Sequence, residues 1–352
     1  MDLNRKITNQ IVVRGVPIGG ANPVVIQSMT NTSTTDVERT LEQIEKLKKA
    51  GCQIVRVTVP DEGAVAAFKS IRNQTDVPLV ADIHFNYKLA IGAIEAGADK
   101  IRINPGNIGT EERVKAVIDA ARNAGIPIRI GVNSGSLEKK LLQKYGGPTP
   151  EALLESAQNY IRTMEKWNFN DIIISIKASD VVKTIKACRL LSENSSVPQH
   201  IGITESGTVR NGSIRSSVGI GTLLAEGIGD TIRVSLAGDP VEEIYVAKEI
   251  LKALELMQGP VVIACPTCGR TQIDIAKLAV EVETIVSTIT NPVKVAVMGC
   301  VVNGPGEARD ADIGIAGGKH EGLVFVKGEV VAKVSEEDLI PTFKKYLAEI
   351  IN

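Results

Sequence analysis

Three of the five cysteines stand in two motifs towards the carboxyl end of the chain. Cys265 and Cys268 are three residues apart in "VVIACPTCGRTQ", and Cys300 follows in "MGCVVNGPGEARDADIG". Thiolates are soft ligands for zinc and for iron–sulfur clusters. Each motif comes directly after an apolar run that is typical of a strand, so the two loops could converge. The sequence therefore predicts a metal centre with three cysteine ligands.

The identity of this metal stays open between two interpretations. Structural zinc normally has four Cys or His ligands, and two of the three histidines, His84 and His200, fall in the other part of the chain. A thioredoxin-like CxxC pair would leave Cys300 without a role. Three thiolates and one other ligand suit an iron–sulfur cluster with one distinct iron. Candidates for the fourth ligand are Glu307, Asp310, Asp312 and His320.

The other two cysteines, Cys52 and Cys188, are expected to be inert buried thiols. An odd number of cysteines in a chain of this length is typical of a reducing compartment. The start of the chain, "MDLNRKITNQ", has no apolar signal core, and no apolar run approaches the length of a membrane helix. These features predict a soluble, cytoplasmic protein that does not enter a membrane.

A second group of polar residues recurs at alternate positions within apolar segments such as "KIRIN" and "IVRVT". Successive strand side chains point to opposite faces, so apolar residues that meet helices leave the polar residues pointing inward. Asp82 and His84 share such a face in "ADIH". Five strands are predicted to aim one cation each at a common centre: Arg56, Arg102, Arg129, Lys177 and Arg233.

These cations predict a bound anion. Two like charges about 8 Å apart repel by roughly 2 kcal/mol at an effective dielectric near 20, and the inward acids Asp82 and Glu205 are too few to neutralise five cations. A polyanion would remove the repulsion, and arginine forks match phosphate oxygens. The alternative is an internal salt-bridge network without a ligand.

Eight apolar runs, each followed by a helix-like stretch, position these residues. Most are 21 to 31 residues apart, the size of a βα unit, and eight such units predict a TIM (β/α)8 barrel. An open doubly wound sheet is the competing α/β fold. The segment "RNGSIRSSVGIG" (210–221) is interpreted as a solvated loop, and a phosphate-contacting helix start is the alternative. The predicted strands are 24–29, 54–59, 79–84, 100–105, 128–133, 172–177, 200–205 and 231–236.

A smaller α/β domain is predicted after a short hinge, "MQGP". The expected boundaries are 1–257 for a substrate-binding barrel and 258–352 for a cluster domain. The predicted elements of the second domain are a strand at 261–264, a helix at 271–289, a strand at 293–298, short strands near 312–316 and 322–333, and a helix at 336–351.

Composition excludes one class of partner. The chain has 40 Lys and Arg against 41 Asp and Glu, which gives a formal net charge of −1. Broad nucleic-acid binding depends on a basic surface. No nucleic-acid partner is expected.

Several motifs together resemble those of the (E)-4-hydroxy-3-methylbut-2-enyl diphosphate synthase family. The resemblance covers essentially the whole chain. The chain is similar to the bacterial two-domain form of the family. The motifs are "CPTCGR", "MGCVVNGPGEARDADIG", "VIQSMTNTSTTD", "VRVTVP", "ADIHFNYKLA", "IRINPGNIG" and "RIGVNSGSL".

The resemblance implies a reaction and a set of site residues. The family reductively opens 2-C-methyl-D-erythritol 2,4-cyclodiphosphate in the non-mevalonate isoprenoid pathway, with two electrons from flavodoxin or ferredoxin passing through a [4Fe–4S] cluster. The implied proton donor to the departing hydroxyl is Glu205. The implied cluster ligands are Cys265, Cys268, Cys300 and Glu307. The implied substrate contacts are Arg56, His84, Arg102, Asn104, Arg129, Asn133, Lys177, Arg233 and Ser235, with Asp82 also in the pocket.

Chain geometry adds an expectation about assembly. The helix predicted at 240–256 spans about 25 Å at ~1.5 Å per residue and ends at the face opposite the active site. A four-residue hinge does not easily return the cluster to its own barrel, so a homodimer is expected in which each cluster domain caps the partner barrel, as the family also implies. A monomer with a folded-back hinge is the alternative. Two other functions stay open, a non-catalytic iron–sulfur electron carrier and a zinc-bearing barrel enzyme of the pterin-binding type.

Overall fold

The computed structural model describes residues 4–300, 309–318 and 320–351. The chain divides into two compact units, Met1–Leu256 and Met257–Asn352. Within the part of the chain that the structure describes, no helix combines the length and the apolar character that crossing a lipid bilayer requires.

The first unit is a ring of eight parallel strands. Their order is β8-β7-β6-β5-β4-β3-β10-β9, and a bridge between Ile174 and Gln199 joins the two ends of the order. This closure confirms the TIM barrel, and the open doubly wound sheet is wrong. The strands are β3 (Val25–Met29), β4 (Ile54–Thr58), β5 (Leu79–Asp82), β6 (Lys100–Ile103), β7 (Ile128–Asn133), β8 (Ile172–Lys177), β9 (His200–Ile201) and β10 (Thr231–Ile232).

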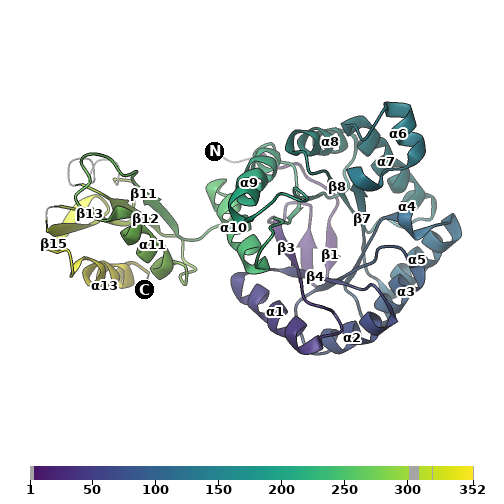
Figure 1. Cartoon of the computed structure of the whole chain (residues 1–352), viewed down its shortest axis with the longest axis horizontal. Helices are drawn as coiled ribbons and strands as arrows, with labels where there is room; N and C mark the ends of the chain where they lie inside the picture. The colour runs from purple at the N-terminus through teal and green to yellow at the C-terminus, as the bar shows by residue number, and fades with distance from the viewer. Residues whose placement is uncertain (1–3, 301–308, 319, 352) are drawn as a thin grey trace. The chain divides into compact units, whose positions relative to one another are not determined.

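Amphipathic helices form an outer layer around these strands (Figure 1). The first of them begins after Asp36, whose carboxylate accepts a hydrogen bond from the Arg39 amide, and ends at Gly51 in the left-handed conformation. The helices are α1 (Val37–Ala50), α2 (Glu62–Arg72), α3 (Tyr87–Glu95), α4 (Pro105–Ile108), α5 (Glu111–Ala124), α6 (Lys139–Tyr145), α7 (Pro150–Lys166), α8 (Val181–Asn194), α9 (Val209–Ala225) and α10 (Pro240–Ala253), with a 3₁₀ turn at Ser134–Ser136.

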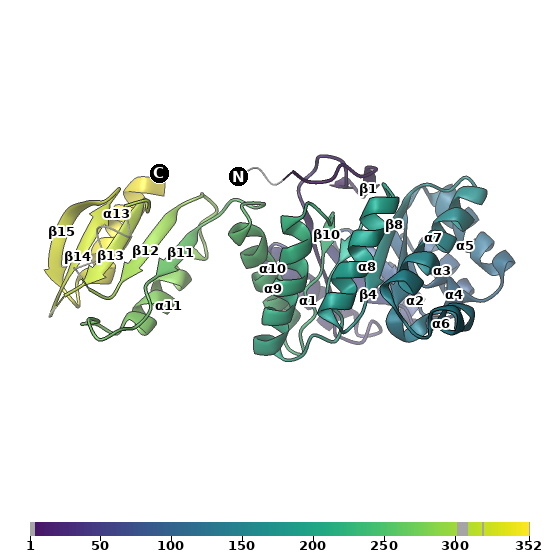
Figure 2. The ribbon, with the colours of Figure 1, turned by 90° about the horizontal axis from the view of Figure 1, so that it is seen from above.

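A β-hairpin that the sequence analysis missed precedes the barrel. Strands β1 (Ile11–Val13) and β2 (Val16–Ile18) pair antiparallel, and Arg14 and Gly15 supply the two positive φ angles of a tight hairpin turn. Apolar side chains of the hairpin pack against the amino-terminal ends of the barrel strands, including Val25 and Ile54. Figure 2 shows β1 at one end of the strands. The hairpin therefore fills the amino end of the barrel.

The segment 210–221 is helical, so its interpretation as a solvated loop is wrong, and the phosphate contact of the alternative helix start stays a prediction. The segment belongs to α9, and its glycines are the reason that the helix can pack closely. A Cβ atom on Gly219 would lie 2.5 Å from Ile203, and one on Gly212 would lie 2.6 Å from Leu236. Tertiary packing therefore overrides the low helix propensity of glycine and serine.

The second unit is a five-stranded sheet in the order β11-β12-β13-β14-β15. The strands β11, β12 and β13 pair in parallel. The strand β14 pairs antiparallel with both β13 and β15. The helices α11 and α13 pack on one face of the sheet, where Val282 and Phe343 meet Val295, Ile313 and Val324. The elements are β11 (Val261–Ala264), α11 (Ile275–Val286), β12 (Lys294–Met298), β13 (Ile313–Gly317), β14 (Glu321–Val326), β15 (Glu329–Ser335) and α13 (Leu339–Ile351). The single predicted segment 322–333 is a hairpin, because the chain reverses at Lys327 and Gly328, both with positive φ.

Candidate active site and metal centre

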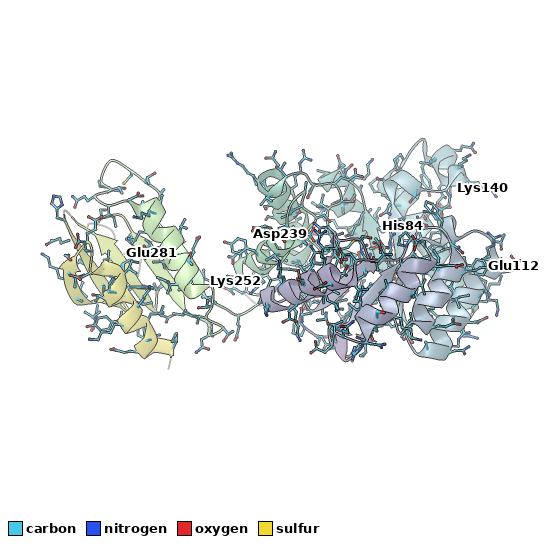
Figure 3. The ribbon with its side chains drawn as sticks, turned by 60° about the horizontal axis from the view of Figure 1, so that its bottom comes forward. His84, Glu112, Lys140, Asp239, Lys252 and Glu281 are labelled. Atoms are coloured by element: carbon cyan, nitrogen blue, oxygen red, sulfur yellow. The ribbon has the colours of Figure 1, made fainter. Side chains whose placement is uncertain are left out.

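A cavity of about 520 Å³ opens at the carboxyl ends of the barrel strands. Residues predicted for substrate binding make up half of its lining, and His84 among them is labelled in Figure 3. Asp82 and Asn104 do not line it. The lining residues are Arg56, His84, Arg102, Asn107, Arg129, Asn133, Ser134, Gly135, Ser136, Ser175, Lys177, Ser179, Thr204, Glu205, Arg233 and Ser235.

Strand register brings the cations together. Arg102 and Arg129 are direct partners on β6 and β7, and Asn133 and Lys177 are partners on β7 and β8. Gly131 makes this crowding possible, because a Cβ atom there would lie 2.8 Å from a guanidinium nitrogen of Arg102. The missing side chain on β7 leaves the space that the Arg102 head group fills.

Asp82 pairs with two of the arginines from behind the lining. Its carboxylate lies 3.2 Å from Arg102 Nη1 and 3.8 Å from Arg56 Nε. Burial alone would raise the pKa of Asp82, but the Arg56, Arg102 and Arg129 guanidinium groups outweigh it and hold that pKa below its ordinary value. Asp82 therefore stays ionised and orders the arginines without itself reaching the cavity.

A second buried carboxylate, Glu243 on α10, holds Arg233. Its two oxygens each lie 3.2 Å from a guanidinium nitrogen, Nε and Nη2, and Ser28 Oγ donates to it at 2.7 Å. Glu243 was not predicted from the sequence, because alternation along strands carries no information about a side chain that arrives from a helix.

Among the cavity-lining cations, Arg129 has two buried nitrogens without a hydrogen-bond partner among the described residues, and Arg102 has one, Nε. Arg129 is 1% exposed, and its two nitrogens without a partner there are Nε and Nη1. Burial, together with Arg56 and Arg102, lowers the pKa of Arg129 well below its ordinary value. Burial likewise lowers the pKa of Arg56 to about 10. Unpaired guanidinium N–H groups facing a cavity are suited to an anionic ligand.

Lysines add to the positive charge. Burial, together with Arg129 and Arg233, lowers the pKa of Lys177 well below its ordinary value. Lys100, which the sequence analysis missed, is fully buried below the cavity and donates to Gln27 Oε1 at 3.2 Å. Its position was detectable, because Lys100 precedes Arg102 by two residues on the same strand.

Glu205 and Asn104 lie on the loops around the cavity. Glu205 is exposed at the cavity, with a left-handed φ of 52°. Its loop is tied to the loop after β10, since Ser206 Oγ donates to the Ser235 carbonyl and Ala237 N donates to the Gly207 carbonyl. Asn104 instead donates from Nδ2 to Ser136 Oγ at 2.9 Å and caps α4. Asn104 therefore positions a lining residue.

In the second unit, Cys265 directly follows β11 and Cys300 lies two residues after β12. These neighbouring strands are parallel, so both residues fall at the same end of the sheet. The Gly299 amide donates to Cys265 Sγ at 3.1 Å, and hydrogen bonds from Arg270 and Thr271 lower the pKa of Cys268. Amide donors to sulfur and a lowered thiol pKa fit thiolate ligands of a cluster.

The structure narrows the fourth-ligand candidates. Asp312 accepts a hydrogen bond from the Lys294 amide at the start of β12, the end of the sheet opposite Cys300. His320 lies between β13 and β14, at the same end as Cys300. Glu307 lies outside the described residues. Within those residues, no three His, Cys, Asp or Glu side chains are grouped closely enough to hold a metal ion.

Two family models match this chain almost end to end. The GcpE TIM-barrel domain matches residues 8–248, and the GcpE protein C-terminal domain matches residues 261–349. The chain belongs to the GcpE family. A relative from Caldanaerobacter subterraneus subsp. tengcongensis is 58% identical over 99% of this chain and 98% of its own length. One from Clostridium perfringens is 57% identical over 99% of this chain and 100% of its own length.

Both of these GcpE relatives are named 4-hydroxy-3-methylbut-2-en-1-yl diphosphate synthase (flavodoxin). The shared enzyme name favours catalysis over a non-catalytic electron carrier. Among solved structures, N-acetylneuraminic acid synthetase from Leptospira borgpetersenii superposes with a TM-score of 0.51 at 11% identity, over 79% of this chain and 97% of that chain. That likeness shows the fold alone.

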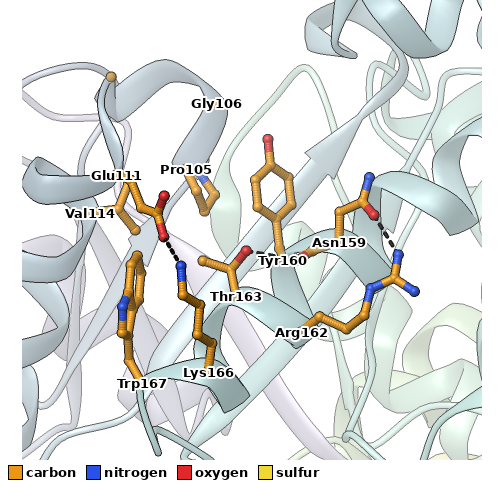
Figure 4. Close-up of a pocket in the computed structure, with 11 residues that line it drawn as sticks. Pro105, Gly106, Glu111, Val114, Asn159, Tyr160, Arg162, Thr163, Lys166 and Trp167 are labelled. Carbon is orange, nitrogen blue, oxygen red and sulfur yellow. Dashed lines mark hydrogen bonds and ion pairs between the residues drawn. The ribbon is translucent and has the colours of Figure 1, made fainter.

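A second cavity of the GcpE barrel, about 500 Å³, lies among α4, α5 and α7 (Figure 4). Its charged side chains are already paired: Lys166 lies 2.6 Å from Glu111, and Arg162 donates to Asn159 at 2.6 Å. None of the substrate contacts predicted from the sequence lines it.

Burial raises the pKa of Cys52 and of Cys188 to about 12, as expected for inert buried thiols.

Proposed function

We propose that this GcpE-family chain reductively opens 2-C-methyl-D-erythritol 2,4-cyclodiphosphate and dehydrates it to (E)-4-hydroxy-3-methylbut-2-enyl diphosphate. The relatives' shared name supports the product. The observation that carries the substrate class is the cavity with five cationic lining residues, among which Arg129 keeps two unpaired nitrogens. A small cyclic diphosphate supplies the charge and the oxygen acceptors that this lining lacks.

Each group of lining residues has a distinct task. Arg56, Arg102 and Arg233 bind the phosphate oxygens from one side, with orientations set by Asp82 and Glu243. Arg129 and Lys177 line the same cavity and supply further positive charge to the anion. The remaining proposed substrate contacts, His84, Asn133 and Ser235, line the same cavity, while Asn104 acts through Ser136.

The cysteines form the proposed redox centre. Cys265, Cys268, Cys300 and Glu307 would hold a [4Fe–4S] cluster, which supplies two electrons to the substrate when bound. The donor set supports this assignment, because Cys265 and Cys300 share one sheet end, Cys268 follows Cys265 by three residues, and Cys265 accepts an amide hydrogen bond. Flavodoxin or ferredoxin is the proposed electron donor, in keeping with the word flavodoxin in the relatives' names.

Glu205 is the proposed proton donor. Two electrons and one proton convert the substrate to product and water: the ring carbon–oxygen bond breaks, and a neighbouring hydroxyl leaves as water. Glu205 sits at the cavity on a loop tied to the Ser235 loop, which supports a fixed donor position. A Glu205→Gln variant is expected to bind substrate and lose turnover, because the amide cannot deliver the proton. Full turnover by that variant would contradict the role.

The division of labour between the two units is also proposed. Residues 1–257 bind the substrate and residues 258–352 hold the cluster, in a cytoplasmic homodimer in which each cluster domain caps the partner's barrel. Mixing a Cys300→Ser subunit with an Arg56→Ala subunit under subunit exchange is expected to restore activity. Unrestored activity despite demonstrated exchange would count against the shared site.

The function is tested with the full chain purified and reconstituted without oxygen. A broad visible absorption near roughly 400 nm identifies the cluster. Reduced methyl viologen and the cyclodiphosphate are then supplied, and product formation is measured. A cluster-loaded protein that leaves the cyclodiphosphate unchanged would overturn the proposal, and a colourless, zinc-loaded protein would favour the zinc-enzyme alternative.

A further inference from the structure

His200 lies where the barrel ring closes. It is the first residue of the two-residue strand β9 and is 1% exposed. Thr231 on β10 is its direct partner in the ladder. Its ring Nδ1 contacts Thr231 Oγ1, and its Nε2 lies 3.4 Å from Lys177 Nζ on β8. The imidazole therefore links the two strands on either side of it.

The neighbours determine which ring nitrogen carries the proton. A lysine ammonium can only donate hydrogen bonds, so below the pKa of Lys177 the Nε2 atom must be the acceptor, and the proton resides on Nδ1, which donates to Thr231. The charged groups with the largest effect on the ring are cations: Arg129 on β7, Lys177 on β8, Lys100 on β6 and Arg56 on β4. Burial and these cations lower the pKa of His200 well below its ordinary value, so the ring is neutral.

We propose that His200 is a positioning residue that, as a neutral imidazole oriented by Thr231, holds the Lys177 ammonium so that it faces the bound anion. The proposal rests on the proposed function, because it takes that anion to be the cyclic diphosphate. His200 is absent from the cavity lining and acts through Lys177 alone.

The surroundings of Lys177 explain why it needs such a partner. His200 is the hydrogen-bond partner that the described structure provides for its Nζ, while Arg129 and Arg233 repel it. Gly202 leaves room for it, since a Cβ atom there would lie 3.0 Å from Nζ. An acceptor behind Nζ directs the remaining N–H groups towards the cavity. At 3.4 Å the hydrogen bond is long, so it orients the ammonium more than it stabilises the fold.

Three variants of the cluster-loaded full chain test the role. His200→Leu removes the acceptor at similar volume and is expected to raise KM for the cyclodiphosphate about tenfold, the effect of one charge-assisted hydrogen bond. His200→Gln offers an amide oxygen and should keep KM within about threefold. Thr231→Val removes the hydrogen-bond partner of Nδ1, so the ring can turn. Its KM should lie between those of the glutamine and leucine variants. An unchanged KM in a folded leucine variant, or a glutamine variant as impaired as the leucine one, would overturn the proposal.

A double-mutant cycle separates positioning from packing. If His200 acts through Lys177, His200→Leu has no further effect on KM in a Lys177→Met background. A purely structural histidine would change KM equally in both backgrounds, which would overturn the proposal.

The tautomer gives a readout that does not depend on turnover. The chain has three histidines, so the ¹⁵N ring signals that disappear in His200→Gln identify His200. A neutral ring protonated at Nδ1 is expected throughout roughly pH 6 to 8. An imidazolium, or a proton on Nε2, would overturn the proposal even if the leucine variant fails to fold. If the wild type folds and shows the expected tautomer but does not turn over the cyclodiphosphate, the proposed function fails and the ring assignment stands.

Discussion

The barrel cavity and the cysteine loops differ in how far the polypeptide alone arranges them. In the barrel, strand ladders and buried carboxylates hold the arginines in place, as the pairing of Arg102 with Asp82 shows. In the second unit, the described thiols lie on loops beyond the strand ends and form no compact ligand group. The comparison shows that strand pairing and buried carboxylates order the barrel cavity, whereas strand pairing fixes only the strand ends from which the cysteine loops begin.

The largest expected effect comes from a cysteine ligand. Cys300→Ser is expected to abolish the visible cluster absorption and turnover, because an alcohol is a poor ligand for iron. Binding of the cyclodiphosphate to the barrel, measured by calorimetry, should persist. Cys188→Ala is the matched control and should keep the cluster, since that thiol is buried in the barrel. Loss of both cluster and substrate binding in Cys300→Ser would show that the two regions are not independent.

A second prediction separates binding from stability in the cavity. Arg129→Met is expected to weaken cyclodiphosphate binding about a hundredfold or more. Without ligand the same variant should be more stable by about 1 to 3 kcal/mol, because a buried and incompletely paired charge is removed. Calorimetry measures the loss of affinity, and thermal unfolding of the same sample measures the gain in stability. The exposed Arg162→Met serves as the control, and a destabilised, ligand-free Arg129→Met would contradict the account.

Two glycines sharpen the comparison further, because they contact different kinds of atom. A Cβ on Gly131 meets the movable Arg102 head group, so Gly131→Ala should raise KM about tenfold with little loss of stability. A Cβ on Gly202 meets the Arg233 backbone carbonyl, so Gly202→Ala should lower the free energy of unfolding by about 1 to 3 kcal/mol. If both variants lost the same stability, the Arg102 side chain would not be moving aside to make room for the new Cβ atom.

The smallest expected effect is a proton taken up on binding. Burial and neighbouring cations lower the pKa of Lys177 in the free protein, and a bound diphosphate raises it again. Between these two pKa values the free lysine is partly neutral, so binding takes up as much as about one proton and affinity falls as pH rises. Calorimetry in buffers of different ionisation enthalpy measures this number. Lys177→Met should abolish the proton uptake. Release of protons by the wild type on binding would contradict the prediction.

Much of the barrel was predictable because its pattern is local. Alternation in "KIRIN" and "IRIGVN" identified Arg102 and Arg129 as inward residues before any contact was known. The same rule should have identified Lys100, two residues before Arg102. The helix over 210–221 was not predictable from propensity, because its glycines are explained by Ile203 and Leu236, which come from other parts of the chain.

Sequence alone determined which side chains point inward and which thiols could hold a metal, because both follow from spacing along one segment. Only the tertiary structure decided which charges are paired. Glu243 reaches Arg233 from a helix, and His200 reaches Lys177 across the ring closure. Asn104 donates to Ser136, a residue that lines the cavity. The reason is physical: side-chain direction is set by the local backbone, whereas pairing depends on distances through space that only the closed barrel establishes.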